Sequence, residues 1–495
     1  MNSPYKKRAP SIEYVSECQL EIPGFETPFS EHLDPNNRWV KLAKQLPWDE
    51  LSGIYLKQYR QKATGRPPLN PRVVLGSIFI KHMCNLDDRE TVAQISENMY
   101  MQYFLGYSSF SAVPPFDASL FVEFRHRLGL QIINEMNERI LNIAKASEAK
   151  PLEDTSKDDN PTEEVTHKGK VIMDATACPQ AIAYPTDLNL VATAREVSER
   201  LIDSIYQKPL HNKKPRTYRQ IARKEYLKAA QRKSASKKIW RKATGKQLRY
   251  LKRNLKFLDK LLDKYPVFPL NKKEQKYLMV IHTLYEQQLE MYTERKHSVA
   301  DRIVSIHQPH VRPIVRGKLK AKVEFGAKIH LSLVDGYAFL DTISWDAFNE
   351  GTFMMEYITN YKRRFGYYPK EVLVDKIYCT RANRKQLKLL DIKLIAKPLG
   401  RPKAGANLVR PGERNPIEGK FGQAKNAYGL NRIKARLKDT SQSWIASIIL
   451  VLNLVKLAGQ VPLCLSFSAW VKQILQYLLI EKTQKQNNVF KFSFS

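Results

Sequence analysis

The sequence contains little cysteine, which argues against a disulfide framework and against a zinc ribbon. The 495 residues include five cysteines at wide spacing, and no pair has the CxxC spacing of a redox motif or zinc ribbon. The motif "HQPH" (307–310) has no cysteine nearby, so its histidines are predicted to belong to a loop rather than to a zinc site. A disulfide framework is not indicated, which favours a reducing, cytoplasmic environment.

Long apolar runs are also missing. The segment "MNSPYKKRAP" has no apolar stretch, so no secretory signal is expected. The longest apolar run, "WIASIILVLNLVKLAG", is interrupted by Asn453 and Lys456, which favours a buried helix over a membrane span. The segment "GRPKAGAN" lacks the Gly-Lys-Ser/Thr ending of a phosphate-binding loop. We therefore expect neither a membrane partner nor ATP use.

Acidic residues are scarce relative to basic ones. The chain has 82 Lys and Arg against 49 Asp and Glu, a net charge of +33. Such a field attracts polyanions, of which nucleic acid is the commonest large one, although a basic surface can also serve solubility. The excess is concentrated, because residues 208–256 contain 19 Lys or Arg and a single acid, Glu225.

This basic segment also has a helical apolar stripe. Leucines recur at steps of three and four residues: Leu248, Leu251, Leu255, Leu258 and Leu262. The pattern predicts helices with one docked face and one basic face. Clustered cations gain free energy by releasing counterions from phosphates, so this face is predicted to contact DNA, the alternative being a solvated surface. The candidate DNA-binding residues here are Arg241, Lys242, Arg249 and Arg253.

The remaining chain reads as an α/β (α+β) protein with helical additions. Helical periodicity over 37–146 predicts an N-terminal helical domain, either with one helix that enters a DNA groove or as a bundle without that role. Strand and helix patterns alternate over 170–200 and 300–460, which predicts a mixed-sheet core. The other predicted segments are a loosely ordered start (1–36), an acidic linker (147–169), a basic helical insertion (201–299) and a helical tail (461–495).

Three acids occupy comparable places in the core. Asp174 follows the apolar run 171–173 at the expected end of a strand, and Asp375 ends another strand. Glu418 lies in the first turn of a helix that begins around Asn415 and Pro416. If these strands are neighbours, the carboxylates are expected within about 4–8 Å of one another, close enough to share two divalent ions. Singly, each acid is also explained by ordinary strand-end and helix-dipole preferences.

The surroundings of Glu418 favour a functional role. Lys425 lies two helical turns after Glu418 and is predicted to share its face, while Arg414 precedes it by four residues. Gly419 and Gly422 would let another backbone or a DNA strand come close. The opposite, core-facing stripe is predicted to consist of Ile417, Phe421, Ala424 and Tyr428.

These segments resemble the DDE transposases of bacterial insertion sequences, which have an RNase H-like catalytic core. Arg414, Glu418 and Lys425 match the family's Arg–Glu–Lys signature, although Pro411 stands where the family usually has Tyr. "VIMDATACPQAIAYPTDLNL" and "VLVDKIYCTRANRKQL" resemble the segments of the two catalytic aspartates, and "PRVVLGSIFIKHMCNLDDRETVAQISEN" resembles the family's helical N-terminal domain. In the second segment the family often has Asp-Arg-Gly-Tyr, whereas this chain has "DKIY".

The resemblance implies that Asp174, Asp375 and Glu418 are catalytic metal ligands for two Mg²⁺ or Mn²⁺ ions, with Arg414 and Lys425 on DNA. It implies an enzyme that binds element ends, cleaves DNA and joins the 3′ ends to target DNA, as a homodimer associated with the bacterial nucleoid. Two alternatives remain open from the sequence. One is an RNase H-like nuclease without strand transfer, and the other is an inactive DNA-binding protein derived from a transposase.

Overall fold

The computed structural model describes residues 33–57, 68–148, 166–232, 234, 236–315, 323–396 and 412–459, with side chains described only to residue 142 in the second of these ranges. Almost all of the predicted loose start (1–36), most of the acidic linker (147–169) and the whole predicted tail (461–495) lie outside the described residues.

The N-terminal region is helical, as predicted. Its helices are α3 (Arg38–Gln45), α4 (Trp48–Lys57), α5 (Pro71–Met83), α6 (Asp88–Glu97), α7 (Met99–Phe104), α8 (Leu120–Arg127) and α9 (Leu130–Glu148). The start of α5 is fixed locally, because Pro71 suits the first turn and the Asn70 side chain accepts the Arg72 N–H at 2.8 Å. Almost every α5 side chain is buried, which explains why its apolar residues are not confined to one face.

A mixed six-stranded sheet forms the centre of the molecule. Its strands are β1 (Lys170–Pro179), β2 (Arg312–Val315), β3 (Val323–Val334), β4 (Tyr337–Ser344), β5 (Glu371–Leu373) and β6 (Lys393–Ile395). β3 pairs antiparallel with β1, β2 and β4, while β5 runs parallel to β1 and β6 parallel to β5. This arrangement confirms the α/β class and agrees with an RNase H-like core.

The first strand is longer than its apolar run suggests. The residues after Asp174 continue to pair with β3, with Ala175 opposite His330 and Pro179 opposite Gly326. The prediction that Asp174 ends its strand was therefore wrong, and this carboxylate projects from the middle of β1. Gly326 is required at this crossing, since a Cβ there would lie 2.1 Å from the Cys178 carbonyl oxygen.

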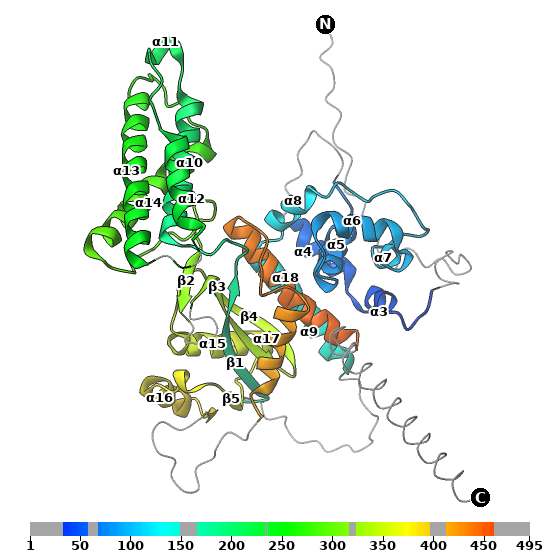
Figure 1. Cartoon of the computed structure of the whole chain (residues 1–495). Helices are drawn as coiled ribbons and strands as arrows, with labels where there is room; N and C mark the ends of the chain where they lie inside the picture. The colour runs from blue at the N-terminus through cyan, green and yellow to red at the C-terminus, as the bar shows by residue number, and fades with distance from the viewer. Residues whose placement is uncertain are drawn as a thin grey trace, which may run out of the picture.

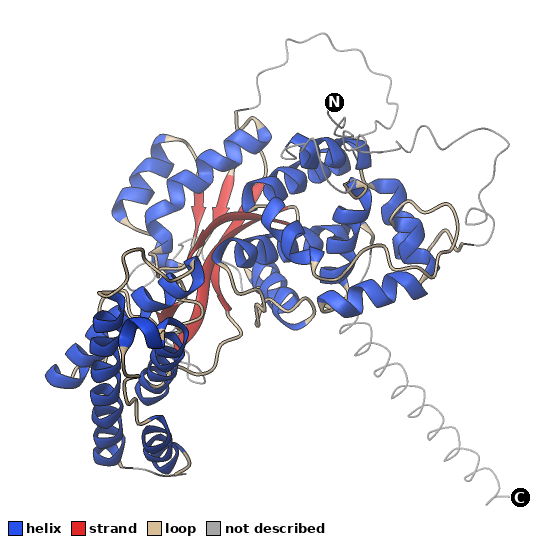
Figure 2. Cartoon of the chain, turned by 90° about the horizontal axis from the view of Figure 1, so that it is seen from above, coloured by secondary structure: helices blue, strands red, loops and turns tan. Residues whose placement is uncertain are grey.

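Helices cover both faces of the sheet, as Figure 2 shows. One face packs against α15 (Met354–Phe365), near the short helices η1 (Glu350–Phe353), η2 (Lys376–Tyr378) and the helix α16 (Arg381–Leu389). The other face packs against α17 (Asn415–Asn426) and α18 (Lys438–Leu457). The predicted core stripe is confirmed, because Ile417, Phe421 and Ala424 of α17 are buried, and so is Tyr428 just after the helix end.

Helix α18 joins the sheet to the N-terminal helices and lies between them in Figure 1. Its length and composition would suit a membrane span, yet 83% of its most apolar window is buried inside the protein. Asn453 interrupts the apolar run for a structural reason. Its amide bonds to both backbone groups of Ala338 on β4 and to the Asn137 side chain of α9, so it links three elements.

The basic insertion between β1 and β2 is a helical unit that projects from the sheet (Figure 1). It consists of α10 (Asp187–Ile205), α11 (Lys208–His211), α12 (Arg219–Ala230), α13 (Lys237–Leu262) and α14 (Lys272–Glu294). The unit starts at Asp187, earlier than the predicted residue 201, because α10 shares a core with α13 and α14. Four leucines of the predicted α13 stripe are buried and Leu262 packs partly buried against them.

The surroundings of His310, a histidine beside the insertion, predict that the fold is sensitive to acid. Burial lowers the pKa of His310 to about 4, and the neighbouring charges of Lys276, Lys438 and Arg312 act in the same direction, while Asp439 opposes them. Its ring packs edge-on against Trp345 at 4.3 Å. The neutral form fits this site, so its contribution to stability is complete above about pH 6.5 and is lost as the pH falls toward 4.

Between about pH 7.5 and pH 5, the wild type is expected to lose about 1–2 kcal/mol of unfolding free energy through His310, after allowance for its partial solvent exposure. His310→Phe should not show this loss. Urea unfolding at about pH 7.5 and pH 5 measures the difference. The exposed His297→Gln serves as the control and should follow the wild type. If the wild type and His310→Phe lost equal unfolding free energy between these two pH values, His310 would not be the source of the acid sensitivity.

Candidate active site

Two of the predicted acids come together on one arginine. The Arg414 Nη2 donates to Asp174 Oδ2 at 3.1 Å, and the Arg414 Nη1 lies 3.2 Å from Asp375 Oδ1. Asp174 comes from the middle of β1, whereas Asp375 follows the neighbouring parallel strand β5 and caps η2 with its side chain. Arg414 is the residue directly before α17. Three segments far apart in sequence therefore meet at one point.

The two carboxylates differ in environment. The Asp174 side chain is 20% exposed and that of Asp375 is 50% exposed. Burial raises the pKa of Asp174, and the charges of Glu350 and Asp375 add to the rise, whereas the Ala175 N–H and Arg414 oppose it. A carboxylate held among other acids in this way gains from a cation, because a cation relieves both the burial and the repulsion.

Glu418 lies in the first turn of α17, as predicted, and its side chain is exposed. Within the described ranges, no three His, Cys, Asp or Glu side chains lie close enough to hold a metal ion. The structure therefore brings together two of the three predicted carboxylates, and Glu418 stays outside, one helical turn after Arg414.

The donor set still suits a hard divalent cation. Asp174 and Asp375 offer carboxylate oxygens, which Mg²⁺ prefers, and they already face a common positive group. Mg²⁺ keeps several waters and substrate phosphates in its shell, so two protein carboxylates are a sufficient set for one ion.

A fourth acid, Glu350, was missed by the sequence reasoning. It opens η1, and its Oε1 lies 2.8 Å from the Lys328 Nζ of β3, with both side chains largely buried. Its charge acts on Asp174 and on Tyr378, whose pKa is raised first of all by burial. No periodic pattern marks Glu350, since it follows a loop, and only the pairing of β3 with β1 brings Lys328 and Glu350 toward the site.

The exposed side of α17 is open around the predicted motif. A Cβ placed at Gly419 or Gly422 would meet nothing within 4 Å, so no described part of the chain needs these glycines for packing. Lys425 is partly exposed in the last turn of the helix. Among the described residues, the space beside Gly419 and Gly422 is therefore open, which agrees with the expected close approach of a DNA strand.

The four predicted DNA contacts of the insertion all lie on α13, in different surroundings. Lys242 and Arg249 are exposed, and the exposed Arg241 stacks over Tyr292 with 4.5 Å from Cζ to the ring centre. Arg253 is partly buried, because its Nη2 donates to the Thr217 carbonyl at 2.7 Å and its guanidinium lies against Tyr218. Further exposed cations, Lys252 and Lys256, extend the basic side of the helix.

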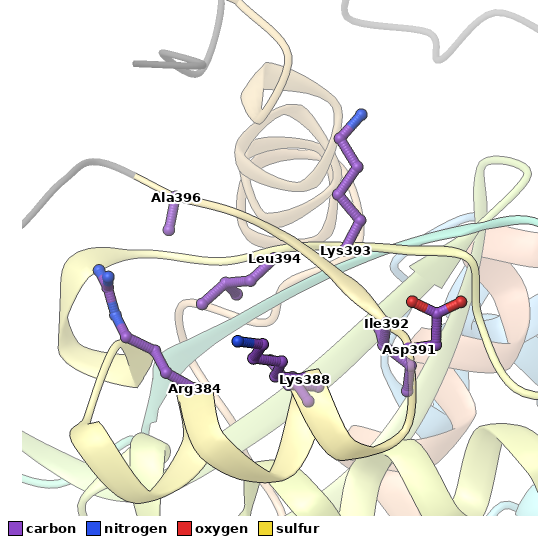
Figure 3. A pocket seen from close by; sticks show the side chains of 8 residues that line it. Arg384, Lys388, Asp391, Ile392, Lys393, Leu394 and Ala396 are labelled. Carbon is purple, nitrogen blue, oxygen red and sulfur yellow. The ribbon is translucent and has the colours of Figure 1, made fainter.

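A basic pocket of about 480 Å³ lies beside α16, the helix that follows Asp375. Figure 3 shows Arg384 and Lys388 projecting from α16 toward the segment that carries Leu394 and Ala396. The helix carries cations at Arg381, Arg384, Lys385 and Lys388, and no acid. Sequence reasoning did not single out this helix, although its charge pattern was visible.

Comparison with known proteins agrees with this geometry. Residues 27–127 match the Transposase domain (DUF772), and residues 372–455 match the Transposase DDE domain. A relative from Rhizobium meliloti, described as uncharacterized protein ORF8 in the nfe locus, is 32% identical over 168 residues, which cover 34% of this chain and 74% of the relative. No solved structure matches the chain.

The two matched domains, which cover the helical N-terminal region and the part of the chain that carries Asp375 and Glu418, identify a transposase with a DDE domain. The chain belongs to the DDE transposases of insertion sequences. Its function lies in transposition, and DNA is its partner.

Proposed function

We propose that this transposase binds the ends of its own insertion sequence, cleaves the DNA there and joins the 3′ ends to target DNA. The observation that carries the proposal is the meeting of Asp174 and Asp375, from neighbouring parallel strands, at one cation beside the start of α17. We further propose that the enzyme works as a homodimer on DNA, in the bacterial cytoplasm at the nucleoid.

Each residue of the site has a proposed task. Asp174, Asp375 and Glu418 would hold two divalent ions, Mg²⁺ or Mn²⁺, which when bound activate the attacking oxygen and stabilise the leaving one. Arg414 and Lys425 would hold phosphates on either side of the scissile bond, since both can pair with phosphate oxygens. The helical insertion would hold the flanking DNA through the basic side of α13, with Arg241, Lys242, Arg249 and Arg253 as the first candidates.

An assay with DNA of the element's own terminal sequence and Mg²⁺ tests the proposal. Cleavage followed by joining of 3′ ends to a second duplex is the expected result. Cleavage without joining would instead identify a nuclease, and binding without cleavage would identify an inactive DNA-binding protein. Each outcome is visible on a denaturing gel with end-labelled DNA.

Lys425 separates a phosphate-binding role from ordinary helix stability. Lys425→Ala is expected to slow cleavage or assembly of the end complex by tenfold or more, about 1.4 kcal/mol of lost stabilisation. A surface substitution of this kind should change the stability of the fold by no more than about 0.5 kcal/mol. A cleavage time course beside thermal melting measures both. A well-folded and fully active variant would remove Lys425 from the site.

A further inference from the structure

Arg414 occupies the position between the two aspartates that a metal ion would need. Both terminal nitrogens of its guanidinium are directed at carboxylates, at 3.1 Å from Asp174 and 3.2 Å from Asp375. The side chain is only 16% exposed, and its Nε is buried without a hydrogen-bond partner among the described residues. The arginine is therefore committed to the acids rather than presented to solvent.

This position conflicts with bound metal. A divalent ion between Asp174 and Asp375 would lie within a few ångströms of the guanidinium charge, and the two cations would repel each other. They would also compete for the same carboxylate oxygens. Removing Arg414 without a replacement cation is unfavourable too, because it leaves Asp174 buried near Asp375 and Glu350 without its counter-ion.

We infer that Arg414 is the resident counter-ion of the DNA-free enzyme, that metal can enter only when it leaves, and that a DNA phosphate is the group that draws it away. The inference rests on the proposed role of Asp174 and Asp375 as metal ligands. Arg414 stands directly before the open face of α17, and a guanidinium binds phosphate through the same two nitrogens that it uses for carboxylates.

Two consequences follow. Metal and DNA bind with positive coupling, because each favours the state in which Arg414 has left the aspartates, and the coupling is the same in both directions. The enzyme also holds its metals weakly until DNA arrives, which restricts cleavage to the assembled complex. Arg414 is thus a positioning residue for the metals as well as a proposed phosphate contact.

The test is a titration of the full-length protein with Mn²⁺, in which the electron paramagnetic resonance signal of free Mn²⁺ reports how much ion is bound. Without DNA, Arg414→Gln is expected to bind Mn²⁺ about tenfold or more tightly than the wild type. Adding a duplex of the element's terminal sequence is expected to increase the Mn²⁺ affinity of the wild type by a similar factor, which lies within the usual range of coupling. The same duplex should increase the Mn²⁺ affinity of Arg414→Gln much less. Arg414→Lys keeps the charge but lacks the two terminal nitrogens that bridge the carboxylates, so its Mn²⁺ affinity should lie between those of the wild type and Arg414→Gln.

Lys376→Gln is the matched control, because it removes one positive charge from the exposed residue next to Asp375 and leaves the bridge intact. It should change Mn²⁺ affinity by only about twofold. If Arg414→Gln and Arg414→Lys bind Mn²⁺ no more tightly than the wild type, while Asp174→Asn abolishes binding, the inference is overturned and the metal site stands. If Asp174→Asn and Asp375→Asn bind Mn²⁺ like the wild type, the proposed metal site itself is overturned.

Discussion

Replacing Asp375 with alanine is expected to abolish strand cleavage while DNA binding stays within a few-fold of the wild type. In the proposed site, Asp375 is a ligand of two ions, so its loss would remove stabilisation of both the attacking and the leaving oxygen. A fall of at least about a thousandfold corresponds to about 4 kcal/mol of transition-state stabilisation. Binding should persist, because the half-exposed Asp375 side chain contributes little to the core, and the proposed DNA contacts of α13 belong to the separate helical insertion.

The same result is expected for Asp174→Asn and Glu418→Ala, which tests each proposed ligand separately. Glu371→Ala is the matched control, since Glu371 starts the strand that leads to Asp375 and pairs with Lys393 away from Arg414. It should cleave at the wild-type rate. Cleavage by Asp375→Ala at a rate comparable to the wild type would falsify the assignment of Asp375 as a ligand. If Glu418→Ala cleaves DNA while the two aspartate variants do not, Asp174 and Asp375 suffice without Glu418.

Neutralising the exposed basic side of α13 is expected to weaken DNA binding by about a thousandfold near 0.1 M salt. The structure directs this test to the exposed cations Lys242, Arg249, Lys252 and Lys256, which recur at helical spacing and share one side. Replacing all four with Gln should lower the slope of log K against log salt by up to about four units, because each lost phosphate contact releases one counterion fewer. Titrations at several salt concentrations measure the slope.

Two controls distinguish contact from overall charge. Gln at four other exposed lysines of the insertion, Lys208, Lys264, Lys272 and Lys273, removes the same charge and should lower the slope less. Arg253→Gln should lower thermal stability as well as DNA affinity, because it also breaks the bond to Thr217 and the stacking on Tyr218, whereas the exposed variants should lower affinity alone. Equal slopes for the two quadruple variants would mean that no particular side of α13 meets the DNA.

Much of the organisation was predictable because it depends on local patterns. The helical N-terminal region, the buried stripe of α17 and the leucine stripe of α13 follow from apolar residues at three- and four-residue steps, which need one face against a core. The interruption of the longest apolar run at Asn453 correctly favoured a core helix. The concentration of charge in residues 208–256 is likewise a property of composition.

The strand that carries Asp174 was harder to delimit. Its apolar run ends at Met173, but small residues at Ala175 and Ala177 continue the ladder because β3 lies beside them. Pairing with a strand more than a hundred residues away in sequence decides such a boundary, and no local signal reports it. Glu350 escaped notice for the same reason, since it joins the site only through the packing of η1 near β3.

The residue types of the proposed chemistry can be read from local motifs alone: two strand-associated aspartates, a glutamate in a first helical turn, and the Arg414 and Lys425 that flank it. Their identities follow from local motifs, which each segment carries independently of the rest. The bridge from Arg414 to Asp174 and Asp375, and the absence of Glu418 from this cluster among the described residues, become visible only in the folded chain. Convergence depends on strand order and on how α17 meets the sheet, and these are settled by burial of surfaces distant in sequence, so the charge relations within the site emerge only on folding.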